Sequence, residues 1–376
     1  MDMPIKETAL GGPPGRSGRD EHARALLASA GIMVNGTRPW DMRIHHPHTL
    51  ERVLRQGSLG LGESYVDGWW DCERVDELIC KLLQARLDHA VGRPGWWWDL
   101  LRARLTKLQS LSRAWQVARV HYDLGNGLYA AMLDPSMAYS CGYWAQADKL
   151  VQAQEAKLEL VCRKLQLEPG MTLLDIGCGW GSLMRHAARH HQVRCVGLTV
   201  SREQMAWAQA QDPDLPLRFE LMDYRQFNPD GQWRFDRVAS IGMFEHVGQR
   251  NYDAFFAVVR RCLHDDGLCL LHTIGKNRSG AGVDPWINKY IFPNGALPSM
   301  AELARSAEDF VVEDWHNFGA DYDRTLMAWH ERFEAAWPQL QAHHDERFHR
   351  MWRYYLLCCA GTFRARDNQL WQVVLS

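Results

Sequence analysis

Several features that mark other protein classes are absent from this sequence of 376 residues. No window of 18 consecutive apolar residues occurs, and residues 1–18 lack an apolar core, so we expect neither a membrane-spanning helix nor a signal peptide. The ten cysteines include no Cys-x-x-Cys pair, which favours free thiols in a reducing compartment, and we expect no metal site. The net charge of −2 argues against a protein that coats nucleic acid. We therefore expect a cytoplasmic protein without a nucleic-acid partner.

Tryptophan, in contrast, is abundant: there are 17, and three of them form the run 96–98. The run follows a Gly-Arg-Pro-Gly break at residues 92–95 and opens a helical pattern that extends to about residue 120. Apolar and basic residues share this pattern, as in a helix that lies in a membrane interface. An interdomain helix with a solvated basic face is the alternative. The apolar set is Leu101, Leu105, Leu108 and Trp115, and the basic set is Arg102, Arg104, Lys107, Arg113 and Arg119.

The rest of the pattern divides the chain into three parts. Residues 1–92 mix short helices and turns, which predicts a small, mainly helical N-terminal domain; residues 93–120 form the linker and basic helix; residues 121–376 form the largest domain. From residue 170 onward, short apolar strands alternate with helical stretches, which predicts a Rossmann-like α/β sheet with helical insertions. The seven strand candidates are 172–178, 193–200, 217–224, 235–242, 267–274, 315–318 and 369–376.

A glycine-rich turn follows the first of these strands. Gly177, Gly179 and Gly181 allow the backbone to approach a ligand closely. The spacing is Gly-x-Gly-x-Gly, not the Gly-x-Gly-x-x-Gly of dinucleotide sites, and no lysine follows as in a phosphate-binding loop. With Asp175 inside the strand, this spacing fits S-adenosylmethionine (SAM) better than NAD. A tight turn without a ligand is the alternative.

The next two strand ends offer further contacts for such a ligand. The second strand ends without the carboxylate that usually holds a ribose, so Thr199 and Gln204 would have to supply those hydrogen bonds. Asp223 and Tyr224 end the third strand, where they are placed to hold the adenine edge and stack on its face. Exposed turn residues are the alternative for each.

Two titratable residues follow the fourth and fifth strands. Glu245 comes after the fourth strand, and His272 lies in the fifth. Ligands of open α/β sheets bind outside the carboxyl ends of the strands, so both side chains are expected to project toward one crevice. Paired titratable groups at such a place favour a functional site over a packed histidine.

Longer stretches of the chain resemble the cyclopropane-fatty-acyl-phospholipid synthase family. The resemblance covers nearly the whole chain, the N-terminal part included, and the combined motifs are highly specific. They lie at residues 121–126, 133–144, 175–181, 242–247, 271–275, 286–295 and 314–329.

The resemblance implies a class I methyltransferase sheet of seven strands and a defined reaction. SAM donates a methyl group to a cis double bond of an unsaturated phospholipid acyl chain, and the methylene bridge then closes to a cyclopropane. It also implies a bound bicarbonate ion as base, and a helical N-terminal domain, here residues 1–92, that assists docking at the inner face of the membrane and formation of a homodimer. By resemblance the bicarbonate cage is Cys141, Glu245, His272, Ile274 and Tyr322. The SAM contacts we expect are Tyr139, Ser140, Asp175, Gly177, Cys178, Gly179, Thr199, Val200, Gln204, Asp223 and Tyr224.

The chemistry of this reaction adds three expectations. Aromatic faces stabilise a cation without attacking it, and Tyr139, Phe244 and Tyr322 are the candidates. Glu245 beside bicarbonate puts two anions together, so we expect a protonated Glu245 or a charged His272. Cys359 corresponds to a cysteine near the family active site, and we expect a packed thiol there because the mechanism needs no thiolate.

Three other functions remain open at this point. A related enzyme could methylate a lipid without closing the ring, although the cage residues argue against it. A soluble small-molecule N-methyltransferase would not need residues 1–120. A non-catalytic lipid-binding module would be expected to lose Glu245 or His272, and both are present.

Overall fold

The computed structural model of the chain describes residues 16–87, 125–227, 234–280 and 282–376. The predicted basic helix at 93–120 lies outside these residues. Within them, no helix is both long and apolar enough to cross a membrane.

A seven-stranded mixed sheet forms the centre of the molecule, which confirms the predicted fold class. The strand order is β5-β4-β3-β6-β7-β9-β8; β9 runs antiparallel to both β7 and β8, and the other neighbours are parallel. The strands are β3 (Thr172–Ile176), β4 (Arg194–Thr199), β5 (Leu217–Leu221), β6 (Phe235–Ile241), β7 (Leu263–Lys276), β8 (Val312–Asn317) and β9 (Asn368–Leu375). Each predicted strand overlaps one of them. β7 begins four residues before the predicted 267 because its pairing with β6 contains a register shift.

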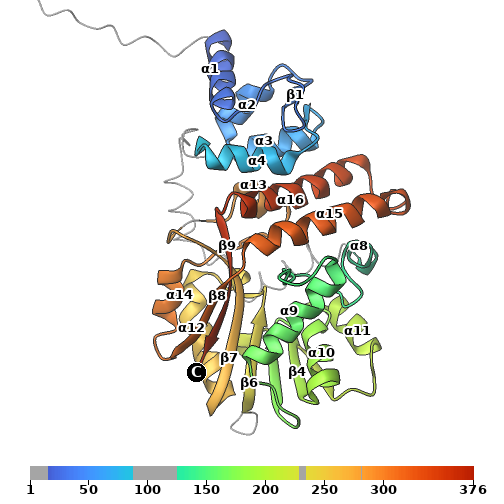
Figure 1. Ribbon diagram of the computed structural model, residues 1–376, viewed down its shortest axis with the longest axis vertical. Coiled ribbons are helices and arrows are strands. Elements are labelled where there is room, and N and C mark those ends of the chain that lie inside the picture. Colours follow the sequence, from blue (N-terminus) through green and yellow to red (C-terminus); the bar gives the residue numbers. More distant parts are fainter. Residues whose placement is uncertain (1–15, 88–124, 228–233, 281) are drawn as a thin grey trace, which may run out of the picture.

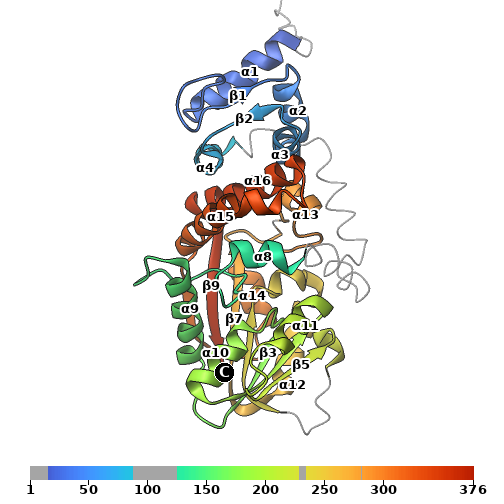
Figure 2. The same cartoon turned by 90° about the vertical axis from the view of Figure 1, so that its right-hand side faces the viewer.

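Helices cover the sheet and extend from its carboxyl end (Figures 1 and 2). Figure 1 shows α15 and α16 lying across this end. The helices of this part are α8 (Asn126–Met132), α9 (Leu150–Lys164), α10 (Ser182–His191), α11 (Arg202–Ala210), α12 (Tyr252–Cys262), α13 (Pro285–Tyr290), α14 (Met300–Ser306), α15 (Ala320–Leu340) and α16 (Glu346–Arg364), with short 3-10 turns η1 (Tyr224–Gln226), η2 (Phe244–His246) and η3 (Gln249–Asn251).

Local sequence fixes several of these helix starts. The Ser201 hydroxyl accepts a hydrogen bond from the Gln204 N–H at the start of α11, which follows β4. Asp284 caps α13 in the same way, and Pro285 occupies the first helical position, where its missing N–H costs nothing. These caps determine where the connections after β4 and β7 turn back toward the sheet.

The N-terminal part is a small unit of helices stacked on α16 (Figure 2). Its helices are α1 (Arg16–Ser29), α2 (Thr49–Gln56), α3 (Ser58–Val66) and α4 (Val75–Gln84), and it also contains a two-residue strand pair, β1 (Arg43–Ile44) with β2 (Trp70–Asp71), which the sequence analysis missed. Buried residues of this unit, such as Trp70 and Leu78, share one hydrophobic core with Trp352 and Tyr354 of α16. The division at residues 92 and 120 stays a prediction.

Candidate functional site

A cavity of about 180 Å³ opens where the glycine loop leaves β3. Gly177 has a φ of 88°, and a Cβ there would lie 2.6 Å from the Met243 side chain, so both conformation and space require glycine. All eleven expected SAM contacts line this one cavity, including Asp175 from β3, Thr199 from β4 and Tyr224 after β5. The structure therefore brings the predicted residues together, while their role in binding stays a prediction.

The predicted ribose and adenine contacts are held by neighbours within the protein. Thr199 Oγ1 donates to Gln204 Oε1 at 3.3 Å. Both carboxylate oxygens of Asp223 accept hydrogen bonds from Arg225, at 2.8 and 2.7 Å. Sequence reasoning missed Arg225, which also lines the cavity and fixes the carboxylate that we expected at the adenine edge.

Lys157 is a second missed residue of this cavity. Its side chain is fully buried, and its Nζ donates to Ser140 Oγ at 2.9 Å. Burial lowers the pKa of Lys157 to about 8 and raises the pKa of Asp175 to about 7, and attraction between the two charges opposes both shifts. Among the described residues, Asp175 Oδ1 has no hydrogen-bond partner. One cation and one carboxyl are thus available at the wall beside the glycine loop.

A second, larger cavity of about 550 Å³ lies between the sheet and the N-terminal helices. Its lining is mostly apolar and comes from α1–α4, α15 and α16, with Leu54, Ile79 and Phe363 as examples. Tyr139, Gly242 and His246 line both cavities, so the two share a wall. Burial lowers the pKa of His246 to about 4, which leaves a neutral imidazole at this junction.

Glu245 lines the apolar cavity, and only one of its two carboxyl oxygens accepts a hydrogen bond from the described residues. Its Oε1 accepts a hydrogen bond from the Ile274 N–H at 2.7 Å, while Oε2 is buried and makes no hydrogen bond with the described residues. Burial raises the pKa of Glu245 to about 7. Ile274 belongs to the expected bicarbonate cage, and its N–H already donates a hydrogen bond to Glu245.

The other expected cage residues lie at different depths. Tyr322 lines the apolar cavity with Glu245 and Ile274, and burial among thiols and acids holds its pKa well above the ordinary value. Cys141 and His272 are buried and line neither cavity. The Cys141 thiol lies 3.7 Å from the Thr325 hydroxyl, one turn of α15 beyond Tyr322. His272 Nδ1 lies 3.3 Å from Gln372 Nε2, its Nε2 has no partner among the described residues, and burial holds its pKa well below the ordinary value.

Two further expectations from sequence differ in outcome. Cys359 lines the apolar cavity as a protonated thiol, since burial raises its pKa to about 12. Phe244 is fully buried against Tyr252 and Phe255 of α12 and lines neither cavity. The expectation that Phe244 faces the reacting atoms is wrong, because the η2 turn buries Phe244 while Glu245 and His246 of the same turn line the apolar cavity.

Comparison with known proteins places the chain in a family. Residues 109–373 match the protein family described as mycolic acid cyclopropane synthetase. The chain is also 56% identical, over 358 residues, to the cyclopropane-fatty-acyl-phospholipid synthase of Escherichia coli (strain K12), covering 94% of this chain and 92% of that protein. The chain belongs to the cyclopropane synthase family. This membership confirms the resemblance inferred from the motifs and identifies the chain as an enzyme.

Solved structures of family members match the sheet and its surrounding helices. The cyclopropane synthase MmaA2 from Mycobacterium tuberculosis is 34% identical with a TM-score of 0.65, and the match covers 69% of this chain and 97% of that one. Mycolic acid cyclopropane synthase CmaA1, solved with SAH and CTAB, is 35% identical with a TM-score of 0.64 and the same coverage.

Proposed function

We propose that this cyclopropane synthase homologue transfers a methylene group from SAM to the cis double bond of an unsaturated phospholipid acyl chain, which forms a cyclopropane ring. The shared wall of the two cavities carries the proposal: a polar cavity beside the glycine loop meets an apolar one at Tyr139, Gly242 and His246. An alkene is a poor nucleophile, so donor and acceptor must be held at near-attack distance, and a shared wall allows this.

The polar cavity fits the zwitterionic donor. Lys157 would pair with the carboxylate of its amino-acid end, and Asp175, whose Oδ1 lacks a partner among the described residues, would accept from its ammonium group. Thr199, Gln204 and Asp223 would hold the nucleoside end. When bound, SAM supplies the methyl group; the residues named here bind and orient it.

The apolar cavity fits the acyl chain. Its volume and mostly apolar lining suit an acyl chain, and three of its polar groups are neutral: the thiol of Cys359, the phenol of Tyr322 and the imidazole of His246. The faces of Tyr139 and Tyr322 are the surfaces available to stabilise positive charge that develops on the acyl chain. Tyr139 is fixed for this by a 2.8 Å hydrogen bond between its hydroxyl and that of Tyr355.

A bicarbonate ion fits the polar atoms behind this cavity. Glu245 Oε2 and His272 Nε2 are buried without partners among the described residues, and an ion with both donor and acceptor capacity would satisfy such atoms. Cys141, Ile274 and Tyr322 complete the cage that we propose. When bound, bicarbonate supplies a base for the proton that leaves the new methyl group. His272 is held neutral, so a protonated Glu245 is the form that avoids two adjacent anions.

Membrane docking is the remaining part of the proposal. A phospholipid substrate requires contact with a bilayer, and the segment 93–120, for which the sequence predicts a basic helix, would dock the protein reversibly on the anionic inner face. A homodimer would strengthen weak docking by avidity. Changing Arg102, Arg104 and Lys107 together to Gln should reduce co-sedimentation with anionic vesicles, most at low salt.

Product analysis tests the proposed reaction. The purified chain is incubated with SAM and vesicles of a monounsaturated phospholipid, with saturated vesicles as the matched control, and the acyl chains are analysed as methyl esters. We expect a product heavier by one CH₂ that has lost its double bond, in the unsaturated sample alone. A heavier product that keeps a double bond would replace the proposal with methylation without ring closure. No lipid product, with SAM binding intact, would point to a soluble acceptor.

A further inference from the structure

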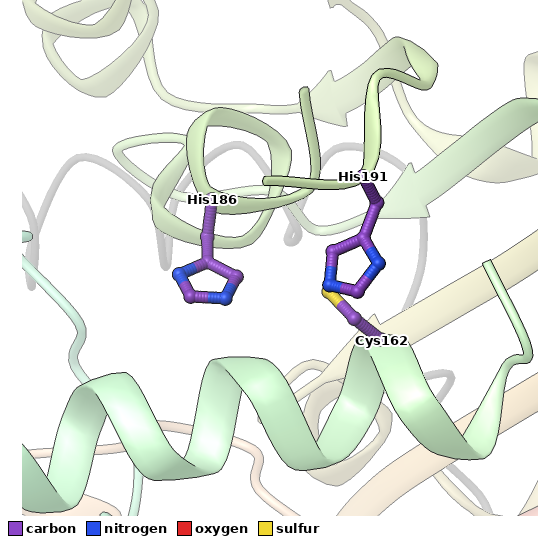
Figure 3. Close-up of side chains that lie close together, drawn as sticks. All are labelled: Cys162, His186 and His191. Carbon is purple, nitrogen blue, oxygen red and sulfur yellow. The ribbon is translucent and has the colours of Figure 1, made fainter. Parts of the chain in front are cut away.

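Two histidines and a cysteine converge on the outer side of the sheet, away from the lining of both cavities. Cys162 lies near the end of α9, and His186 and His191 lie on α10. Each side chain offers one ligand atom, and these atoms all lie within 4.8 Å of one another. Figure 3 shows both imidazole rings turned toward the sulfur of Cys162.

Glu159 adds a carboxylate beside the two histidines. It lies one turn before Cys162 on α9, and its Oε2 is 3.2 Å from His186 Nε2 and 3.0 Å from His191 Nε2. A thiol, two imidazoles and a carboxylate thus meet between two packed helices. We name this group the α9–α10 cluster; it consists of Glu159, Cys162, His186 and His191.

We propose that the α9–α10 cluster binds one zinc ion. Thiolate and imidazole are the preferred ligands of zinc, carboxylate oxygen is a common further one, and four such groups satisfy its tetrahedral preference. Zinc–ligand bonds of roughly 2.0–2.3 Å place neighbouring ligand atoms roughly 3.3–3.8 Å apart. The two O···N distances, 3.2 and 3.0 Å, already approach this spacing, and the sulfur, within 4.8 Å of both nitrogens, would have to move inward.

Zinc would displace the proton of the Cys162 thiol to solvent, and the His186 imidazole would coordinate through Nε2 with its proton on Nδ1. The competing arrangement is a metal-free one in which Glu159 accepts hydrogen bonds from both rings.

The surroundings suggest that such an ion is structural. Cys162 packs in a core cluster with Leu173 of β3 and Ala187 of α10. Four protein ligands leave no open position for a substrate. The ion would clamp the end of α9, the helix that carries Lys157, onto α10, which follows the glycine loop.

Zinc content of the full-length chain, purified without a histidine tag, tests the proposal. We expect one zinc per chain that His191→Gln loses, with an affinity at least about 100-fold weaker in a competitive chelator titration. His190→Gln, a change of the adjacent histidine on the same helix, should keep the wild-type affinity. Zinc added to the stripped wild type should raise Tm, and the same addition should leave the Tm of His191→Gln unchanged.

A cobalt spectrum identifies the sulfur ligand. The cobalt-loaded wild type should show thiolate-to-metal charge-transfer absorption that Cys162→Ser removes and that Cys195→Ser, a change of another buried thiol of the same core cluster, retains. If Cys162→Ser does not fold, the partly exposed His186→Gln replaces it, with loss of zinc as the expected result. Equal zinc affinity in wild type and His191→Gln, or a cobalt spectrum without the thiolate band, would overturn the proposal in favour of the hydrogen-bonded cluster.

Discussion

The two cavities that meet at Tyr139 and Gly242 differ in how the chain builds them. The polar cavity comes from residues 137–247 with Pro293 and Asn294, and most of its lining follows a strand end. The apolar cavity gathers residues from α1 through α16, more than 300 positions apart in the chain. Each cavity holds a buried carboxyl with a pKa raised to about 7, Glu245 in the apolar one and Asp175 in the polar one, but only Asp175 lies with a fully buried lysine, Lys157. The proposed donor site therefore rests on backbone geometry at strand ends, and the proposed acceptor site rests on long-range packing.

Closing the polar cavity should give the largest effect and leave the apolar one unchanged. Gly177→Ala places a Cβ 2.6 Å from Met243 at a φ of 88°, so the loop must move. Strain and displacement together should weaken SAM binding by about 100-fold or more, as measured by titration calorimetry. Gly127→Ala is the matched control, because a Cβ at Gly127 meets no atom within 4 Å. If Gly177→Ala binds SAM with the affinity of the wild type, the glycine loop does not determine the shape of the polar cavity.

Filling the apolar cavity should have the converse effect. Cys359→Phe inserts a ring beside Tyr322, so we expect lipid turnover to fall by about 100-fold through misplacement of the acyl chain. SAM affinity should stay within about twofold, because Cys359 does not line the polar cavity.

Cys359→Ser separates volume from thiol chemistry at the same position. It keeps the side-chain size, so turnover should remain near that of the wild type. A serine variant as inactive as the phenylalanine variant would assign Cys359 a chemical role and contradict our interpretation of it as a packed thiol.

Glu245 lines the apolar cavity, where burial of its ionised carboxylate lowers the stability of the folded protein. Burial raises its pKa from 4.5 to about 7, so the folded state binds the proton more tightly than the unfolded state. The free energy of unfolding should therefore fall as pH rises from 4.5 to 7. Glu245→Gln keeps an acceptor for the Ile274 N–H and removes this titration. It should be more stable than the wild type by about 3 kcal/mol above pH 7 and equally stable below pH 4.5.

Urea unfolding at both pH values measures this difference, and activity measures the role of the proton. A constant difference at the two pH values would mean that Glu245 is not the titrating group. If Glu245→Gln retains most of the wild-type turnover, the side chain acts by hydrogen bonding. If it is as inactive as Glu245→Ala, the charge or its proton is required.

The sequence predicted the sheet and the polar cavity well because both follow from short-range pattern. Apolar runs bounded by turns marked all seven strands, and strand ends in a parallel sheet meet at one edge. The apolar cavity could not be predicted, because helices α1–α4 meet α16 through long-range packing and through ion pairs such as Arg364–Asp76, which no short-range pattern shows. Phe244 was misassigned since a 3-10 turn, unlike a strand, does not alternate its side chains. Lys157 could have been identified from the sequence. It falls on the buried face of α9 with Ala153, Gln154 and Val161, where a charged side chain is unusual.

Substitution of Lys157 has the smallest predicted effect on binding, and it best separates the two cavities because Lys157 lines the polar cavity alone. Lys157→Met keeps the buried stem and removes the cation, so SAM should bind about tenfold more weakly, with little change in kcat. The wild-type KM for SAM should rise as pH increases through about 8, where Lys157 loses its proton, and the KM of the variant should stay flat. Lys149→Met, at an exposed position before α9, should keep the wild-type profile. A parallel rise of KM in wild type and Lys157→Met would mean that another group carries the pH dependence. Lys157 would then only support Ser140.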